Sequence, residues 1–155
     1  VIRYPRGGGV LVDWRCPLEE IKVGTGRKLH DGSDVAVLSI GPIGNNVVEA
    51  IEELSSQSGQ TSVAHYDMRF LKPIDETILQ EVAEKFNRII TVENGVKTGG
   101  LGSAVIEWMN DHGYHPEIIR LGLPDTEFVE HGTVAELQHI VGLDKEAIIK
   151  AIKGI

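Results

Sequence analysis

Short apolar runs alternate along this chain with segments whose apolar residues return every three or four positions. Such alternation is typical of repeated strand-helix units, which build a mostly parallel sheet with helices packed on its faces. The pattern starts near Asp34 and continues to the C-terminal end of the sequence. The distribution of hydrophobic and polar positions therefore predicts an α/β fold.

Four of the apolar runs have the length of buried strands and are bounded by Gly, Pro, Ser or Asp. We expect these strands at residues 35–40, 62–70, 88–92 and 117–124. The segment 22–32 precedes them and lacks a helical partner. We interpret it as a short edge strand with a turn, and leave open whether it runs antiparallel to its neighbour.

Helices are expected between the strands, because apolar residues recur there at helical spacing. The first ends in the breakers of residues 55–59, the second begins at the N-cap Asp75, and the third follows a glycine-rich loop at 95–103. Two short helices close the chain; they are divided at Gly142, and Asp144 caps the second. The residues expected to face a core are Val47, Val48, Ala50, Ile51, Leu54, Ile78, Leu79, Val82, Ala83, Phe86, Ala104, Val105, Ile106, Trp108 and Met109.

Composition narrows the range of partners. The chain has 155 residues, 41% of them hydrophobic, which is enough for one domain with a substantial core. Its formal net charge is −8 and its 15 basic residues are scattered, so we expect no nucleic acid partner. No apolar run approaches the roughly 20 residues that span a bilayer. We therefore expect no membrane insertion and a cytoplasmic location.

The beginning of the sequence differs from the rest. It starts at Val1 without an initiator Met, and residues 1–20 contain three consecutive glycines and two prolines. We interpret residues 1–20 as the end of a preceding domain with a linker, and residues 21–155 as the domain proper. The chain is accordingly expected to be a piece of a longer protein.

Two segments have the chemistry of anion sites. Arg3 and Arg6, in the segment RYPRG, carry guanidinium groups that suit bidentate capture of phosphate or carboxylate, or that merely form ion pairs along a linker. The loop Gly99–Ser103 precedes a helix, whose free amides could cradle an anion. Its glycine spacing differs from a dinucleotide fingerprint, and the alternative is that the glycines let the helix pack closely on the sheet.

Other polar residues are weaker candidates. Asp67, Arg69 and Lys72 follow a strand at the edge where open α/β sheets bind ligands, although an ion pair of Asp67 with Arg69 or Lys72 that holds the turn is the simpler explanation. The lone Cys16 cannot form an internal disulfide and lacks the features of a nucleophile. The six histidines do not form a metal signature; only His112 and His115 lie three apart.

Six longer motifs cover nearly the whole chain. They are RYPRG at 3–7, GTGRKLHDGSDVAVLSIG at 24–41, DMRFLKPID at 67–75, TVENGVKTGGLGSAV at 91–105, LGLPDTEFVEHG at 121–132 and GLDKEAIIKAI at 142–152. Their order and spacing resemble those in the C-terminal domain of a known family, the 1-deoxy-D-xylulose-5-phosphate synthases.

The resemblance implies a transketolase C-terminal domain-like fold, with three α/β/α layers and a mixed, mostly parallel sheet of five strands. It implies a parent enzyme that decarboxylates pyruvate on thiamine diphosphate with Mg²⁺ and adds the two-carbon unit to glyceraldehyde 3-phosphate. In that family the cofactor groups lie in upstream domains, so this chain alone is expected to be inactive and mainly structural. The upstream domains of the same chain and a second subunit are its implied partners.

Only one family site maps onto this chain residue by residue. Arg6 matches the family's ligand for the phosphate of glyceraldehyde 3-phosphate, and Arg3 is a second candidate. The chain departs from the family in one motif, because members often read Thr-Val-Glu-Glu-Asn at residues 91–95, where this chain has TVENG, and so no role of the second glutamate is carried over. The alternatives are a transketolase, a 2-oxo acid dehydrogenase β subunit, or a free-standing module that binds an anion at Gly99–Ser103.

Overall fold

The computed structural model describes residues 15, 17, 19–56 and 61–154. The predicted phosphate ligands Arg3 and Arg6 and the lone Cys16 lie outside this part of the chain. The strands are β1 (Arg27–His30), β2 (Val35–Ile40), β3 (Val63–Asp67), β4 (Arg88–Val96) and β5 (Glu117–Leu123), and the helices are α1 (Gly44–Ser55), α2 (Glu76–Lys85), α3 (Leu101–Asp111), α4 (Val134–Ile140) and α5 (Lys145–Lys153).

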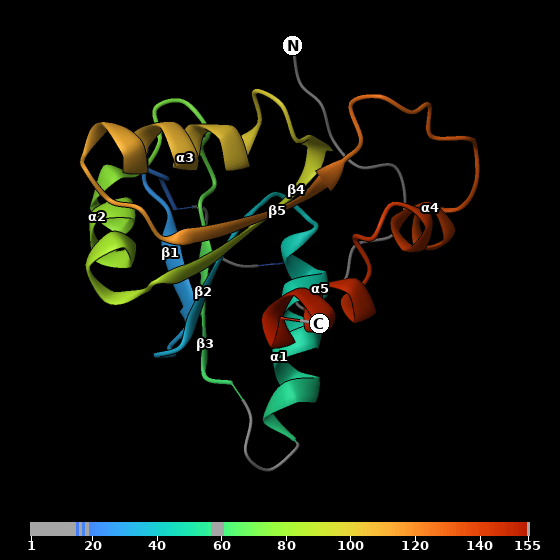
Figure 1. Cartoon of the computed structure of the whole chain (residues 1–155), viewed down its shortest axis with the longest axis horizontal. Coiled ribbons are helices and arrows are strands. Elements are labelled where there is room, and N and C mark those ends of the chain that lie inside the picture. Colours follow the sequence, from blue (N-terminus) through green and yellow to red (C-terminus); the bar gives the residue numbers. More distant parts are fainter. Residues whose placement is uncertain (1–14, 16, 18, 57–60, 155) are drawn as a thin grey trace.

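The five strands form one sheet in the order β1-β3-β2-β4-β5. Strands β2, β3, β4 and β5 are parallel, and β1 pairs antiparallel with β3 at one edge. Helices α1 and α5 cover one face and α2 and α3 the other, which gives three layers (Figure 1). The predicted mixed five-stranded α/β/α fold is confirmed, and the orientation left open for the edge strand is antiparallel.

Two strand ends differ from the prediction. Strand β3 ends at Asp67 instead of residue 70, because Arg69 adopts a left-handed conformation (φ 54°) that turns the chain away from the sheet. Strand β4 continues to Val96, which pairs with Leu123 beyond an irregularity in register. Most of the expected glycine-rich loop is therefore strand or helix.

The predicted caps are present. Asp75 accepts a hydrogen bond from the backbone amide of Ile78 at 3.1 Å, and Asp144 accepts one from that of Ala147 at 2.9 Å. Gly142 separates α4 from α5 with φ 69°, a conformation that suits glycine. Local sequence chemistry thus fixes where these helices begin.

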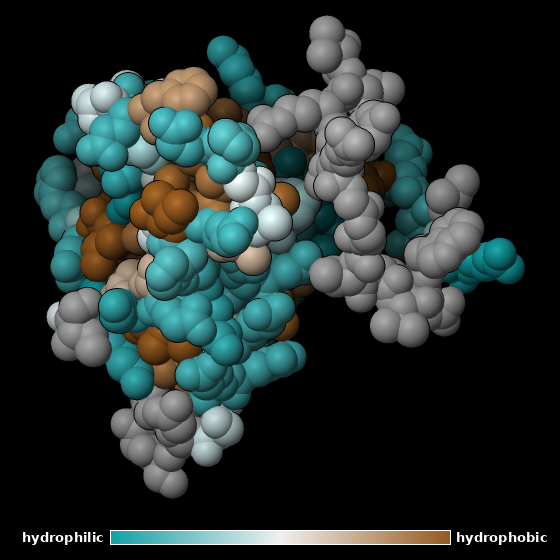
Figure 2. All heavy atoms as spheres, turned by 90° about the vertical axis from the view of Figure 1, so that its right-hand side faces the viewer, coloured by the Kyte–Doolittle hydropathy of each residue, from teal (hydrophilic) through white to brown (hydrophobic). Residues whose placement is uncertain are grey.

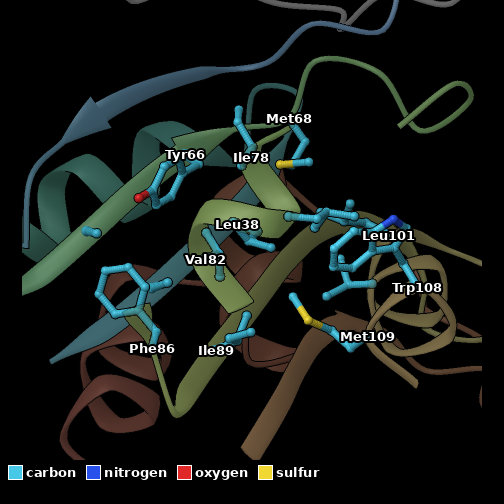
Figure 3. Packing of buried hydrophobic residues seen from close by; sticks show 14 residues of the cluster. Leu38, Tyr66, Met68, Ile78, Val82, Phe86, Ile89, Leu101, Trp108 and Met109 are labelled. Atoms are coloured by element: carbon cyan, nitrogen blue, oxygen red, sulfur yellow. The ribbon is translucent and has the colours of Figure 1, made fainter. Parts of the chain in front are cut away.

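Each face of the sheet has its own hydrophobic core. On the α2 and α3 side, Leu38, Tyr66 and Ile89 of the sheet meet Leu79 and Met109 of the helices. Figure 3 shows the side chains of this cluster packed between the strands and the helices. The opposite core joins residues of β2 and β4 to α1 and α5. Because β2 to β5 are parallel, their carboxyl ends lie at a common edge, and the two cores hold the helices against the faces of this sheet.

Three predicted core residues are not in either core, and one of them, Ala104 of α3, is half-buried. Val48 of α1 and Ile106 of α3 are exposed. Both helices are covered on one side only, so a residue at the border of the apolar stripe remains in contact with solvent.

Candidate functional site at the carboxyl edge of the sheet

The N-terminus of α3 holds a carboxylate of the protein itself. Glu93, near the end of β4, is only 5% exposed. Its Oε2 accepts a hydrogen bond from the amide of Leu101 at 2.9 Å, and its Oε1 accepts one from Gly102 at 3.0 Å. These are the first amides of the helix, which have no partner within a helix. The site predicted for an external anion at Gly99–Ser103 is therefore filled by Glu93.

The glycines of this loop are needed for close approach. A Cβ on Gly100 would collide with Glu93 Oε2, and one on Gly102 would lie 2.6 Å from Arg120 Cδ. Both positions thus bring the backbone of α3 against side chains of the sheet. The structure supports the packing explanation of the glycine spacing over the anion-binding one.

The turn before α3 is tied to the end of β5. Ser103 Oγ donates to the carbonyl of Lys97 and accepts from the amide of Gly99, both at 3.0 Å. Thr98 donates from its hydroxyl to Asp125 at 2.9 Å. These bonds join the segment after β4 to the segment after β5, so both loops share one surface at this edge.

The predicted turn at Asp67 is held by ion pairs. Asp67 lies 3.1 Å from Arg27 Nε and 3.9 Å from Arg69 Nε, and it accepts a hydrogen bond from the amide of Arg69 at 3.2 Å. The expected pair with Arg69 is confirmed, and the pair with Arg27 was not predicted. Among the described residues, Lys72 forms no ion pair with Asp67.

Backbone contacts join this turn to the segment before β1. The amide of Gly26 donates to Asp75 at 2.8 Å, and a Cβ on Gly26 would lie 2.8 Å from the carbonyl oxygen of Asp67. Two motifs about 40 residues apart therefore form one corner of the domain. Its polar groups largely satisfy one another, which indicates a structural role.

A buried polar pair that was not predicted lies on the α1 side of the sheet. Ser39 Oγ and His65 Nε2 are 2.8 Å apart, and both side chains are buried. Burial lowers the pKa of His65 to about 4, so the imidazole is neutral at neutral pH. The other ring nitrogen, Nδ1, has no partner among the described residues. The sequence signal was a polar residue within an apolar run, Ser39 in β2 and His65 in β3.

The Ser39–His65 pair has the atoms of a nucleophile and a base, but it lacks their usual setting. A catalytic pair needs access for substrate and a third group that orients the imidazole. Both side chains are buried, and within the described part of the chain no group meets His65 Nδ1. We interpret the pair as structural.

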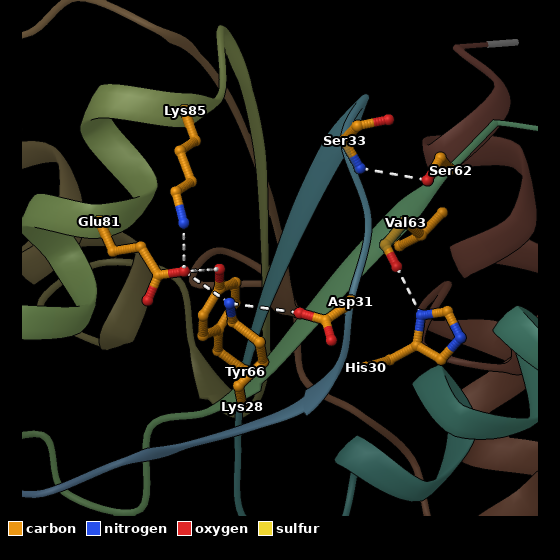
Figure 4. A network of polar contacts seen from close by, with 9 residues as sticks. All are labelled: Lys28, His30, Asp31, Ser33, Ser62, Val63, Tyr66, Glu81 and Lys85. Atoms are coloured by element: carbon orange, nitrogen blue, oxygen red, sulfur yellow. Dashed lines mark hydrogen bonds and ion pairs between the residues drawn. The ribbon is translucent and has the colours of Figure 1, made fainter.

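A network of charges fastens the edge strand to α2 (Figure 4). Glu81 Oε1 lies 2.5 Å from Lys28 Nζ and 2.9 Å from Lys85 Nζ, and Tyr66 donates its hydroxyl hydrogen to the same oxygen at 3.2 Å. The hydrogen bond from Lys28 is the largest cause that lowers the pKa of Glu81 to about 2. The network positions β1 and contains no catalytic pair.

Comparison with known proteins identifies the family. The family model described as "Transketolase, C-terminal domain" matches residues 24–148. The chain belongs to this family. The described part of this transketolase C-terminal domain agrees with that assignment, because β1 to α4 and the start of α5 fall within the matched region.

Curated relatives of the domain are named as synthases. It is 59% identical over 152 residues to "1-deoxy-D-xylulose-5-phosphate synthase" of Bacteroides thetaiotaomicron, which covers 98% of this chain and 23% of the relative. The synthase of Geobacillus thermodenitrificans is 43% identical over 155 residues, covering 99% of this chain and 24% of the relative. The chain thus spans about a quarter of the length of these relatives and matches their C-terminal part.

Solved structures agree on the fold. One is "Split gene transketolase, inactive beta4 tetramer", which has a TM-score of 0.78 at 29% identity and covers 88% of this chain and 43% of that one. The transketolase of Campylobacter jejuni has a TM-score of 0.59 at 14% identity, covering 85% and 19%. At that identity the likeness concerns the fold alone.

Two features of the described residues bear on thiamine diphosphate and Mg²⁺. No group of three or more His, Cys, Asp or Glu in this part of the chain could hold a metal ion. The first amides of α3, at the loop predicted to bind an anion, are bound to Glu93. His112, one of the two histidines that lie three positions apart, stacks on Trp108, with ring centroids 4.0 Å apart.

Every helix within the described ranges is too short or too polar to span a bilayer.

Proposed function

We propose that this chain is the C-terminal domain of a 1-deoxy-D-xylulose-5-phosphate synthase. The parent enzyme condenses pyruvate with glyceraldehyde 3-phosphate, with loss of CO₂, on thiamine diphosphate and Mg²⁺. The product is a precursor of isoprenoids, thiamine and pyridoxal. The observation that carries the proposal is the 59% identity to a synthase over 98% of this chain. Identity to the two transketolases of solved structure is lower, at 29% and 14%, which favours the synthase.

The role proposed for the domain is structural. It aligns the catalytic domains and supports a homodimer in the cytoplasm, while the cofactor and Mg²⁺ are bound by the upstream part of the parent. The internal use of Glu93 supports this role, because the anion site predicted at Gly99–Ser103 is already filled. The same observation removes the basis for a free-standing anion-binding module. Residues 1–20 are proposed to belong to the preceding domain and its linker.

An activity assay tests the proposal. The full synthase and this 155-residue chain are each given pyruvate, glyceraldehyde 3-phosphate, thiamine diphosphate and Mg²⁺. Activity is expected only in the full protein. Activity in neither would overturn the choice of parent enzyme, and activity in this chain alone would overturn the structural role.

Arg6 is proposed to bind the phosphate of glyceraldehyde 3-phosphate, with Arg3 as a second contact. In the full synthase, Arg6→Ala should raise the KM for glyceraldehyde 3-phosphate about 10- to 100-fold, because one charge-assisted hydrogen bond contributes about 1.5–3 kcal/mol. The KM for pyruvate should change little. Lys150→Ala, on the exposed side of α5, is the control that removes a charge elsewhere. Equal effects of Arg6→Ala on both substrates would contradict the assignment.

The corner around Asp67 is proposed to face the other domains or the second subunit. Asp67→Asn would remove the charge that holds Arg27 and Arg69, so the corner should loosen. Sedimentation of the full synthase should then show a weaker dimer. Unchanged sedimentation and activity would exclude this role.

A further inference from the structure

The most exposed apolar region in the described part of the C-terminal half surrounds α4. We call Val96, Phe128, Val134, Leu137 and Ile140 the α4 surface. We propose that the α4 surface is where the domain docks onto the upstream part of its own polypeptide, which would present an apolar element flanked by basic side chains. This inference rests on the proposed function, since it requires the longer synthase.

Helix α4 is only loosely attached to the domain, where Gln138 accepts a hydrogen bond from Asn46 of α1 at 3.1 Å. None of its seven residues, all within the described part of the chain, is buried. Val134 and Ile140 are 65% and 72% exposed, although their spacing with Leu137 places all three on one side of the helix. A single helix of this length is unstable in water without tertiary packing. An apolar side on such a helix indicates a missing partner.

The surface is hollowed where a partner could insert. A pocket of about 290 Å³ is lined by Leu137 and Ile140 of α4, by Phe128, and by Lys97 and Gly122 next to the ends of β4 and β5. Phe128 itself is 89% exposed at the pocket, and Val96 at the end of β4 is 49% exposed. In Figure 1, α4 lies beyond the arrowheads of β4 and β5. Figure 2 faces that side of the molecule and shows apolar atoms at the surface among polar ones.

Charge around the pocket indicates the chemistry of the partner. Glu127 and Glu130 line it, with Lys97 as a cation on the opposite loop. The chain as a whole carries a net charge of −8. A partner that buries Phe128 and Ile140 would therefore gain from basic side chains at the rim, which favour correct orientation.

The length of the relatives argues for the upstream polypeptide as the occupant. This chain corresponds to 23% of the Bacteroides thetaiotaomicron synthase, so most of such a protein lies outside it. Interfaces between domains of one chain typically bury about 600–1,500 Å². Elsewhere among the described residues, Leu29, Val48, Leu71 and Ile106 are 37–42% exposed, and Ile21 and Val23, just before β1, are 53% and 66% exposed. Phe128 and Ile140 of the α4 surface are more exposed than all of these. The α4 surface is the better candidate for such an interface.

Hydrogen exchange measured by mass spectrometry tests the proposal. Peptides that cover residues 124–141 are compared between the full synthase and the 155-residue chain. We expect exchange in this region to be at least about tenfold slower in the full protein, because docking would remove local opening of α4. Equal exchange in the two proteins would overturn the proposal. Protection that rises with the concentration of the 155-residue chain would also overturn it, since a second copy would then be the occupant.

Substitutions in the full synthase give a second measurement. The double variant Phe128→Ser, Ile140→Ser should restore fast exchange at 124–141, and the matched control Ile106→Ser, on α3, should not. If both variants exchange like the unaltered protein, the α4 surface does not dock. The activity of the unaltered synthase is assayed on the same preparation. Protection without synthase activity would refute the proposed function alone, and activity without protection would refute the docking alone.

Discussion

Helices α3 and α4 both begin near the carboxyl edge of the sheet, and in both a glutamate is part of the N-terminal cap, yet the two are attached in different ways. The glutamate of α3 is Glu93, which belongs to β4 and is buried. The glutamate of α4 is Glu136, which lies in its own first turn and forms an exposed capping box with Thr133. A cap that comes from the sheet makes the start of a helix depend on the whole fold, whereas a cap within the helix does not.

Packing of the two helices follows the same division. Five residues of α3 are buried, including Leu101, Trp108 and Met109, while α4, within the described part of the chain, buries none. We therefore expect α3 to open only when the domain unfolds and α4 to open by itself. Three changes test this difference.

Removal of the Glu93 carboxylate should have the largest effect. Glu93→Ala leaves the buried amides of Leu101 and Gly102 without acceptors and removes two charge-assisted hydrogen bonds. We expect the free energy of unfolding, measured by urea denaturation, to fall by about 4 kcal/mol. Glu93→Gln keeps one amide oxygen as acceptor and should lose about half as much. A loss below about 0.5 kcal/mol, typical of surface substitutions, would refute the dependence of α3 on the sheet.

Acid should destabilise the fold, and α3 with it, through His65. Its pKa is about 4 in the folded protein and about 6.5 when unfolded, so the unfolded chain binds a proton first as the pH falls. Stability should therefore be complete above pH 6.5 and should decrease by about 3 kcal/mol as the pH falls to about 4.

Urea denaturation at several pH values measures this loss, and His65→Gln is the control. The variant should lose stability overall but should lack the decrease between pH 6.5 and 4. An equal decrease in both proteins would mean that another group titrates. Exchange of the α4 amides, corrected for the intrinsic effect of pH, should change little, since α4 opens locally.

The smallest global effect is expected from the cap of α4. Glu136→Ala removes the carboxylate that accepts from the backbone amide and hydroxyl of Thr133, all at an exposed site. In this chain, faster exchange should appear at residues 133–137, while the midpoint of urea unfolding stays the same. A shifted midpoint would show that α4 is part of the cooperative unit and would weaken the contrast with α3.

Sequence analysis predicted the fold because burial and local capping are both visible along the chain. The strand 35–40 is an apolar run with Ser39 as its one polar residue, and Asp75 and Asp144 stand directly before the helices they cap. The predicted end of β3 was wrong, because an arginine in the sequence does not indicate that its backbone will be left-handed, as that of Arg69 is. The assignment to the transketolase C-terminal family rested on the resemblance of sequence motifs, because the periodicity of apolar residues alone predicts only the fold class.

The polar contacts at the carboxyl edge could not be predicted in the same way. Glu93 lies eight positions before its partner Leu101, and Ser39 lies 26 positions before His65. Such partners meet only after the strands have paired, and no spacing rule connects them. The exposure of α4 was hidden for a related reason, because an apolar helix face looks the same in sequence whether this domain or another covers it.

The outer edge of β1 affects whether such a domain aggregates at high protein concentration. An open strand edge offers unpaired backbone groups to which a strand of another molecule can add, which is the start of aggregation. β1 has only four residues, carries Arg27 and Lys28, and has an irregular register between Lys28 and His30. A short, charged and distorted edge is a poor template for strand addition. The ion pairs of Lys28 with Asp31 and Glu81 hold this edge strand in position, and so they also disfavour polymerisation.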